Sequence, residues 1–247
     1  MITTQLKAIF SFRSYHSLAS GSRWYLLGFI LYLFFFCLFV FQFRATGYIS
    51  EQLPQALRSF PEISFDKGVL THPKTKTVYT VPRIDMKIVF DASSEKVPSK
   101  EDFINQQQVM LVSGNKFYTP SAFGIQTQTI PESFTLTTSQ EWLKKHQSAL
   151  SATLSAMAFL SALLFLPFWM LFGICLSAAT LTFFKIINKA YYLPQSLIWK
   201  WALFMLAPLS ALWILRLWWP IPLFSFAQII LCIIYAQQIF NTLPEVK

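Results

Sequence analysis

Long apolar runs that carry no charged residue alternate with one polar block along this chain. The first run, Trp24 to Phe43, has 20 residues, enough for a helix to cross a hydrocarbon core of about 30 Å. It is too long for the apolar region of a typical signal peptide, and no small-x-small cleavage site follows it. We therefore predict an uncleaved transmembrane helix over residues 24–43.

A second uncharged stretch, Ala149 to Phe184, has 36 residues and permits two interpretations. One helix of that length would measure about 54 Å. A hairpin of two short spans would instead break near Pro167. The following segment, KIINKAYYLPQSLIWK, has three lysines and no acid, and positively charged loops stay in the cytoplasm. With the polar block outside, one crossing places this loop inside, so we favour a single long helix.

Two more apolar runs, separated by RLWWPIP, complete the pattern. We predict a multi-pass α-helical membrane protein with four transmembrane helices, an inserted small α+β extracytoplasmic domain and both termini in the cytoplasm. Trp24, Trp199 and Trp201 would form an inner aromatic belt, and Trp142, Trp218 and Trp219 an outer one. The predicted segments are a cytoplasmic N-terminal segment 1–23, transmembrane helix 24–43, outer domain 44–148, long transmembrane helix 149–184, cytoplasmic loop 185–196, transmembrane helices 197–217 and 223–240, and cytoplasmic tail 241–247.

Residues 1–22 mix apolar and basic positions, which fits either a short interfacial helix or a disordered tail. In the polar block, Glu51 to Phe60 predicts a short helix that is broken at Pro61. Two short runs around the turn Asp66 to Gly68 predict a β-hairpin. Ser99, followed by acids, resembles a helix N-terminus. The predicted strands are 63–65, 69–71, 77–81, 86–90, 109–112, 116–119 and 126–130.

The charge distribution argues against a nucleic-acid partner, although the net charge is +9. Twelve basic and ten acidic residues nearly balance within residues 44–145, so the positive excess flanks the apolar runs, as in cytoplasmic loops. Cys37, Cys175 and Cys232 all lie within apolar runs, which excludes a disulfide-stapled outer domain. We expect these three thiols to be buried and to act as small hydrophobic groups.

No motif assigns an enzyme activity, so we predict that the chain is not an enzyme and has no catalytic, cofactor-binding or metal-binding residue. The apolar runs lack the ionisable side chains that a coupled transporter or an intramembrane protease would need. The outer carboxylates, including Asp66 and Asp91, fit turns and solvated faces better than a hydrolase pair. Asp91 follows a strand and can order the next turn. The small residues from Ser151 to Ala162 recur at four-residue spacing, which suits packing within the chain or a homodimer.

Four stretches resemble a bacterial multi-pass family, the domain of unknown function 1189. They are FSFRSYHSL before the first run, FPEISFDKGVLT at 60–71, IVFDAS at 88–93 and WALFMLAPLSAL at 201–212. Ala92 and Ala207 stand where that family usually has threonine. The resemblance implies the topology given above and no established activity. The family-like structural positions are Pro61, Asp66, Gly68, Asp91 and Pro208.

We therefore expect a non-enzymatic protein of the bacterial cytoplasmic (inner) membrane, embedded in the lipid bilayer. Its outer domain would bind a ligand or an envelope protein partner, which includes a second copy of the chain. The alternative is an accessory subunit of a small-molecule transporter, with a sugar as one candidate solute.

Overall fold

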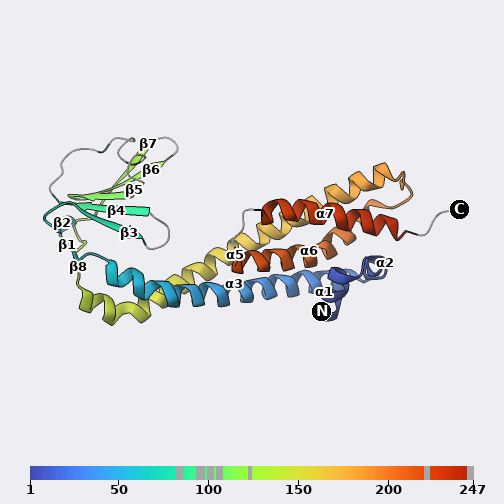
Figure 1. The fold of residues 1–247 in the computed structure, drawn as a ribbon, viewed down its shortest axis with the longest axis horizontal. Helices are drawn as coiled ribbons and strands as arrows, with labels where there is room; N and C mark the ends of the chain where they lie inside the picture. The colour runs from blue at the N-terminus through green and yellow to red at the C-terminus, as the bar shows by residue number, and fades with distance from the viewer. Residues whose placement is uncertain are drawn as a thin grey trace. The chain divides into compact units, whose positions relative to one another are not determined.

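A computed structural model describes residues 1–81, 86–92, 98, 103, 108–121, 124–219 and 223–243. The chain divides into two compact units (Figure 1). The helix unit consists of Met1–Ala45 and Ser155–Lys247, and the sheet unit is Thr46–Leu154. The protein is mostly helical and combines three long apolar helices with a small sheet region, as in a membrane protein.

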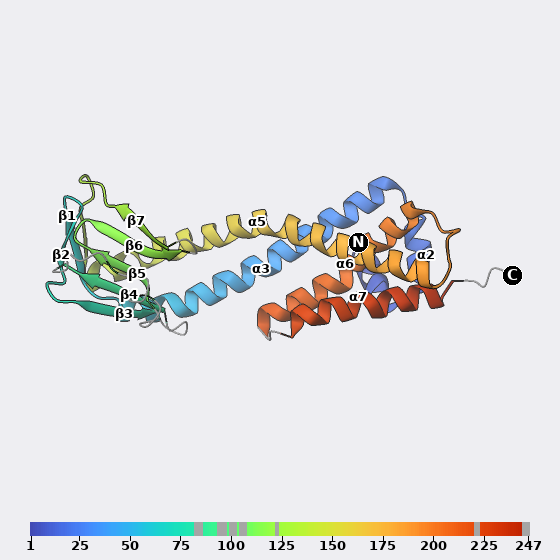
Figure 2. The ribbon, with the colours of Figure 1, turned by 90° about the horizontal axis from the view of Figure 1, so that it is seen from above.

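The described helices are α1 (Ile2–Phe10), α2 (Ser14–Ala19), α3 (Arg23–Ser59), α5 (Gln140–Ile187), α6 (Gln195–Trp218) and α7 (Phe224–Asn241). Among the described residues, α3, α5 and α6 are long and apolar enough to cross a membrane, and α7 is a shorter apolar helix. In the helix unit, α6 and α7 lie side by side (Figures 1 and 2).

The stretch from Ala149 to Phe184 is part of one continuous helix, α5, which contains Pro167 in its interior. The prediction of a single helix is confirmed, and the hairpin alternative is wrong. A proline removes one backbone hydrogen bond, but neighbouring groups in an apolar bundle can compensate for that loss.

Residues 51–59 are helical and the helix ends before Pro61, as predicted, but they do not form a short helix of their own, because α3 runs without a break from Arg23 to Ser59. The change from apolar to polar residues after Phe43 suggested a boundary. Polarity decides what surrounds a helix, whereas backbone propensity and packing decide whether the helix continues. Residues 44–53 contain no proline, and α3 then continues through Pro54 to Ser59.

Helix α6 is the centre of the helix unit. In the most apolar 18-residue segment of α6, 61% is buried, against 28% in the corresponding segment of α3 and 22% in that of α5. Trp201, Phe204 and Leu206 of α6 are fully buried. A Cβ added at Gly173 of α5 would lie 3.1 Å from Leu206 Cδ2, so this glycine permits close contact between the two helices.

The N-terminal segment folds as α1 and α2 and packs against the rest of the helix unit, so the disordered-tail alternative is wrong. Thr4, Gln5, Ala8 and Tyr15 are buried. The Tyr32 hydroxyl on α3 donates a hydrogen bond to Gln5 Oε1 at 2.8 Å. This contact attaches α1 along the side of α3.

Two predictions for single side chains are wrong. Trp201, expected in an aromatic belt, is completely buried in contact with the rings of His16 and Phe240. Cys175, expected to be buried, is exposed on α5, whereas Cys37 and Cys232 are buried. The apolar runs that contain Trp201 and Cys175 are hydrophobic on every side. The sequence therefore contains no signal for which side of each helix faces inward.

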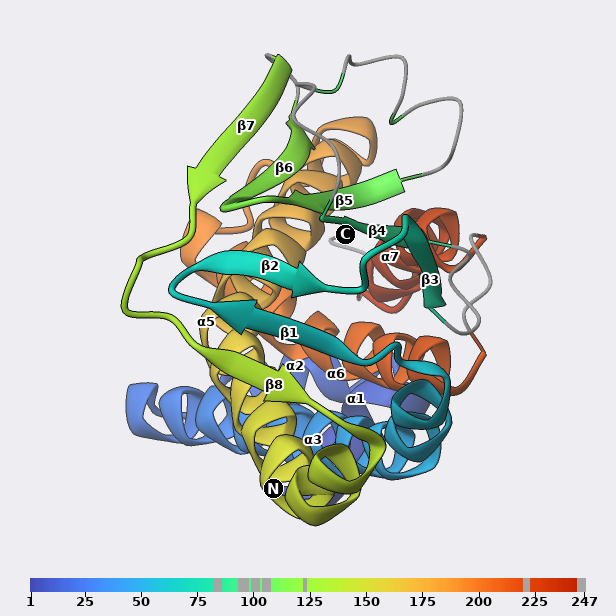
Figure 3. The same ribbon diagram turned by 90° about the vertical axis from the view of Figure 1, so that its left-hand side faces the viewer.

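The sheet unit contains two sheets (Figure 3). The three-stranded sheet has the order β2-β1-β8 and the five-stranded sheet the order β3-β4-β5-β6-β7. Among the strand pairs of the described residues, β4–β5 is parallel and the others are antiparallel. The predicted hairpin and the five further strands are confirmed, whereas the predicted helix start at Ser99 lies outside the described residues. The strands are β1 (Ile63–Asp66), β2 (Val69–His72), β3 (Thr77–Val81), β4 (Met86–Asp91), β5 (Gln108–Ser113), β6 (Lys116–Ser121), β7 (Gly124–Thr129) and β8 (Leu136–Thr138).

One hydrophobic core holds the two sheets together. Phe65 and Leu70 of the smaller sheet pack with Tyr79, Phe90 and Val112 of the larger one. A backbone hydrogen bond of 2.8 Å from the Leu70 N–H to the Gly114 carbonyl also joins the sheets. This core covers only part of the inner face of the five-stranded sheet, and the uncovered part is the site described next.

Candidate functional site

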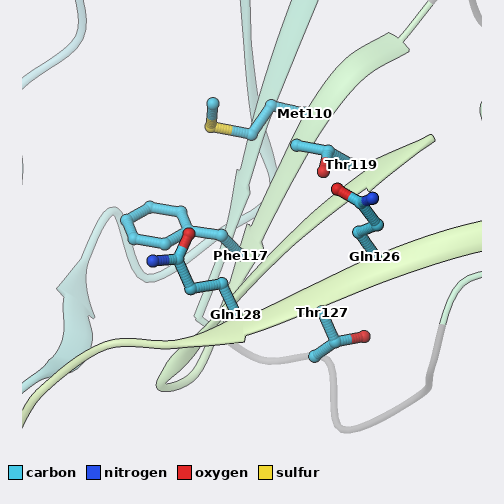
Figure 4. Close-up of a pocket in the computed structure, with 6 residues that line it drawn as sticks. All are labelled: Met110, Phe117, Thr119, Gln126, Thr127 and Gln128. Carbon is cyan, nitrogen blue, oxygen red and sulfur yellow. The ribbon is translucent and has the colours of Figure 1, made fainter. Parts of the chain in front are cut away.

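A hollow of about 500 Å³ lies on strands β5, β6 and β7 of the five-stranded sheet (Figure 4). The described residues that line it are Met110, Phe117, Thr119, Gln126, Thr127 and Gln128. Met110 and Phe117 also pack against the core shared by the two sheets, so they connect the floor of the hollow to the folded interior.

Strand register brings the hollow's side chains together. Phe117 lies opposite Gln128, and Thr119 lies opposite Gln126. Directly opposed side chains in antiparallel strands have Cβ atoms about 4.5–5.5 Å apart. Figure 4 shows Gln126 and Gln128 on one side of β7 and Thr127 on the other, as the two-residue period of a strand requires.

The described residues that line the hollow are all uncharged. On the side of β7 that carries Gln126 and Gln128, two carboxamides and the Thr119 hydroxyl can donate and accept hydrogen bonds, while Phe117 and Met110 offer an apolar surface. Ligand sites typically combine an apolar floor with a few convergent polar groups in volumes of about 300–1,000 Å³. The arrangement suits an uncharged ligand with several hydroxyl or amide groups and one apolar face.

The family-like positions Pro61, Asp66, Gly68, Asp91 and Pro208 do not form one site. Pro61 precedes β1, Asp66 ends β1 and Gly68 is in the following turn, whereas Asp91 ends β4 in the other sheet. Pro208 lies in the buried middle of α6 in the helix unit. None of the five lines the hollow on β5–β7.

Gly68 has a clear structural reason to be glycine. Its φ is +76°, and an added Cβ would lie only 2.5 Å from the Pro131 carbonyl oxygen. Its N–H donates a hydrogen bond of 2.7 Å to the Phe134 carbonyl. The turn therefore attaches the β1–β2 hairpin to the segment that leads into β8.

Carboxylates and cysteines do not gather into a metal site among the residues that the structure describes. Asp66 is exposed at its turn, and Asp91 is half-buried, paired in register with Ser113 of β5. Asp66 and Asp91 thus belong to different sheets, in positions that suit turn formation.

In the helix unit, the groups with shifted pKa values outside the apolar runs are on α2. Burial raises the pKa of Tyr15 well above its usual value, and the Tyr15 hydroxyl donates to the Ala8 carbonyl at 2.9 Å. Burial lowers the pKa of His16, although a hydrogen bond with the Ile239 backbone opposes that shift. His16 Nε2 also lies 3.3 Å from Thr242 Oγ1. These contacts fasten α2 to the end of α7.

Sequence reasoning missed the hollow, because it searched for ionisable residues. A weak signal was present in the GIQTQT sequence of β7, where polar residues occupy both faces of a strand. That pattern indicates a strand without a buried face of its own, which is where a ligand or another chain has room.

No family model, curated protein or solved structure matches this chain.

Proposed function

We propose that this chain is a bacterial inner-membrane protein with four crossings that displays residues 46–154 outside the cytoplasm as a non-enzymatic binding domain. The hollow on β5–β7 is the observation that carries the binding role. A stable fold that leaves uncharged polar and aromatic side chains converging on an open face is typical of recognition.

Helix lengths and charges support the topology. Helix α7 has 18 residues, so it measures about 27 Å, close to a hydrocarbon core of about 30 Å. Lys185, Lys189 and Lys200 lie at or between the facing ends of α5 and α6, as expected for a cytoplasmic connection. Both termini then lie in the cytoplasm.

Thiol labelling of intact cells tests the topology. Thr71→Cys lies on an exposed strand of the sheet unit, and Tyr191→Cys lies in the exposed connection between α5 and α6. A membrane-impermeant maleimide should label the first variant in intact cells and the second only after permeabilisation. Labelling of Tyr191→Cys in intact cells would show that the proposed topology is wrong.

Saturation-transfer NMR on the full chain in nanodiscs tests the binding role. The probes are neutral mono- and disaccharides and a blocked neutral tripeptide. At least one probe should receive saturation, and Gln128→Ala should weaken its binding about fivefold to tenfold through loss of one hydrogen bond. Thr80→Ala, an exposed residue on β3, is the matched control and should stay within twofold of the wild type. Equal losses of probe affinity in Gln128→Ala and Thr80→Ala, or no saturation of any probe, would contradict a ligand site in the hollow on β5–β7.

The second candidate is an accessory subunit of a small-molecule transporter. The neutral amide and hydroxyl lining of the hollow favours it, because such groups suit a sugar-like solute. A deletion strain should then take up at least one neutral solute more slowly. Unchanged uptake across a broad panel of solutes would remove this alternative and leave the binding role intact.

A further inference from the structure

A second hollow, of about 400 Å³, lies between two helices of the sheet unit. The C-terminal part of α3 contributes Ser50, Leu53 and Pro54. The first turns of α5 contribute Lys144, Gln147, Ser148 and Ser151, whose spacing of three and four residues places them on one helix face. One ammonium, one amide and two hydroxyls of α5 thus line the same wall.

These four α5 side chains are exposed or half-buried, so their hydrogen-bonding groups are accessible to a ligand. Within the described part of the chain, Lys144, Gln147, Ser148 and Ser151 make no side-chain hydrogen bond and no ion pair. The Ser50 hydroxyl, in contrast, already donates to the Thr46 carbonyl at 2.9 Å. Glu51 and Glu141 are sequence neighbours of this hollow, yet neither lines it. The wall on α5 is therefore rich in donors and carries a lysine that makes no ion pair with any residue the structure describes.

The position of the hollow along the sequence suggests where its ligand comes from. Ser50 follows the uncharged run that ends at Phe43 by seven residues, and Ser151 lies at the start of the run that begins at Ala149. If both runs cross the bilayer, Ser151 lies near the depth of the lipid headgroups, and Ser148 and Lys144 lie about 5 and about 10 Å further out along α5. A phosphodiester there is an anion with acceptor oxygens, which matches a lysine surrounded by hydroxyls.

We infer that this hollow binds phosphate, supplied by the headgroup of an outer-leaflet phospholipid. The inference relies on the membrane topology proposed above and is independent of the hollow on β5–β7. A bound headgroup would hold the emerging ends of α3 and α5 together at the membrane surface.

Native mass spectrometry of the delipidated full chain in a neutral detergent tests this site. The probes are phosphatidylglycerol in one arm and inorganic phosphate in the other. Wild-type protein should retain phosphatidylglycerol, and the double variant Lys144→Gln/Ser148→Ala should bind it at least tenfold more weakly. Lys145→Gln, an exposed neighbour that does not line the hollow, is the matched control and should stay within twofold of the wild type.

Each other outcome has a definite meaning. Equal losses in the double variant and in Lys145→Gln would show unspecific charge attraction and overturn the site. Binding of inorganic phosphate as tightly as the lipid would overturn the lipid source. Retention of no lipid by the wild type would overturn the whole inference. A wrong topology would be detected separately by the thiol labelling, so the two failures are distinguishable.

Discussion

The two units of this protein place their apolar side chains in opposite ways. In the sheet unit, large apolar residues such as Phe65 and Phe90 are inside, and the exposed strand β7 is made largely of threonine and glutamine. In the helix unit, Phe35, Phe39 and Phe43 of α3 are 60–71% exposed. The sheet unit therefore has the surface of a protein in water and the helix unit that of a protein in lipid, within a single chain.

Helix α3 shows how the helix unit distinguishes inside from outside. Its inward positions Leu26, Phe29, Leu33 and Cys37 are buried, and its outward positions Leu27, Leu31, Phe35, Phe39 and Phe43 are exposed. Both faces are apolar, so no contrast in polarity separates them. A helix in water needs such a contrast, whereas a helix in lipid is sorted by packing alone.

A charge on an exposed position is the strongest test of this comparison. Phe39→Asp should make membrane insertion and folding less favourable by about 2–3 kcal/mol, because a carboxylate at the centre of a transmembrane helix costs about 3 kcal/mol and Phe39 lies between the centre and the end of the run 24–43. Val78→Asp, at an exposed position on β3, should cost about 1 kcal/mol or less. The yield of folded, membrane-inserted protein and its melting temperature in detergent measure both effects.

If Phe39→Asp and Val78→Asp lowered the yield of membrane-inserted protein and its melting temperature to a similar extent, the assignment of α3 to lipid would be contradicted. Phe39→Leu is the control for the lost aromatic ring and should keep most of the wild-type yield.

Glycine replacements compare how tightly the two units are built. Gly68→Ala combines a positive φ with a contact of 2.5 Å to a backbone oxygen, so the sheet unit should lose about 2 kcal/mol or more. Gly173→Ala in α5 meets only the end of a flexible leucine side chain at 3.1 Å, and alanine favours a helix, so the net change should be below about 1 kcal/mol. Thermal unfolding of the full chain measures both.

Gly114→Ala separates backbone strain from crowding at Gly68. Gly114 has a φ of +55° and nothing within 4 Å of an added Cβ, so its replacement should cost about 1 kcal/mol. If Gly114→Ala lowers the free energy of unfolding as much as Gly68→Ala does, then crowding against Pro131 contributes nothing to the loss at Gly68.

The smallest expected effect is a pH dependence of the helix unit. Burial lowers the pKa of His16 below 6.5, so the unfolded state binds a proton first as the pH falls. Stability should therefore be complete above about pH 7 and should decrease as the pH falls below 6.5. Thermal melting at pH 7.5 and 5.5 measures the loss, and His16→Gln should reduce the difference. An equal pH dependence in His16→Gln would assign the effect to other groups.

Several elements of the fold were predictable because their signals are local. The β1–β2 hairpin follows from the turn Asp66 to Gly68, and the continuity of α5 through Pro167 follows from the lysines after Phe184. The hollow on β5–β7 was not predictable, because Phe117, Gln126 and Gln128 become neighbours only through strand register. The same holds for the lysine wall on α5, which becomes a hollow only where α3 lies opposite it.

The apolar helices, seven of the eight described strands and the distribution of charge follow from the sequence alone, whereas β8 (Leu136–Thr138) was not predicted. Those properties depend on residues close together in the chain. Only the tertiary structure decided that α6 is the buried centre, that Trp201 is buried, that Cys175 is exposed, and that α1 and α2 pack against the other helices. In apolar runs every face is equally hydrophobic, so burial depends on which helices meet, and that information is not present in any single run.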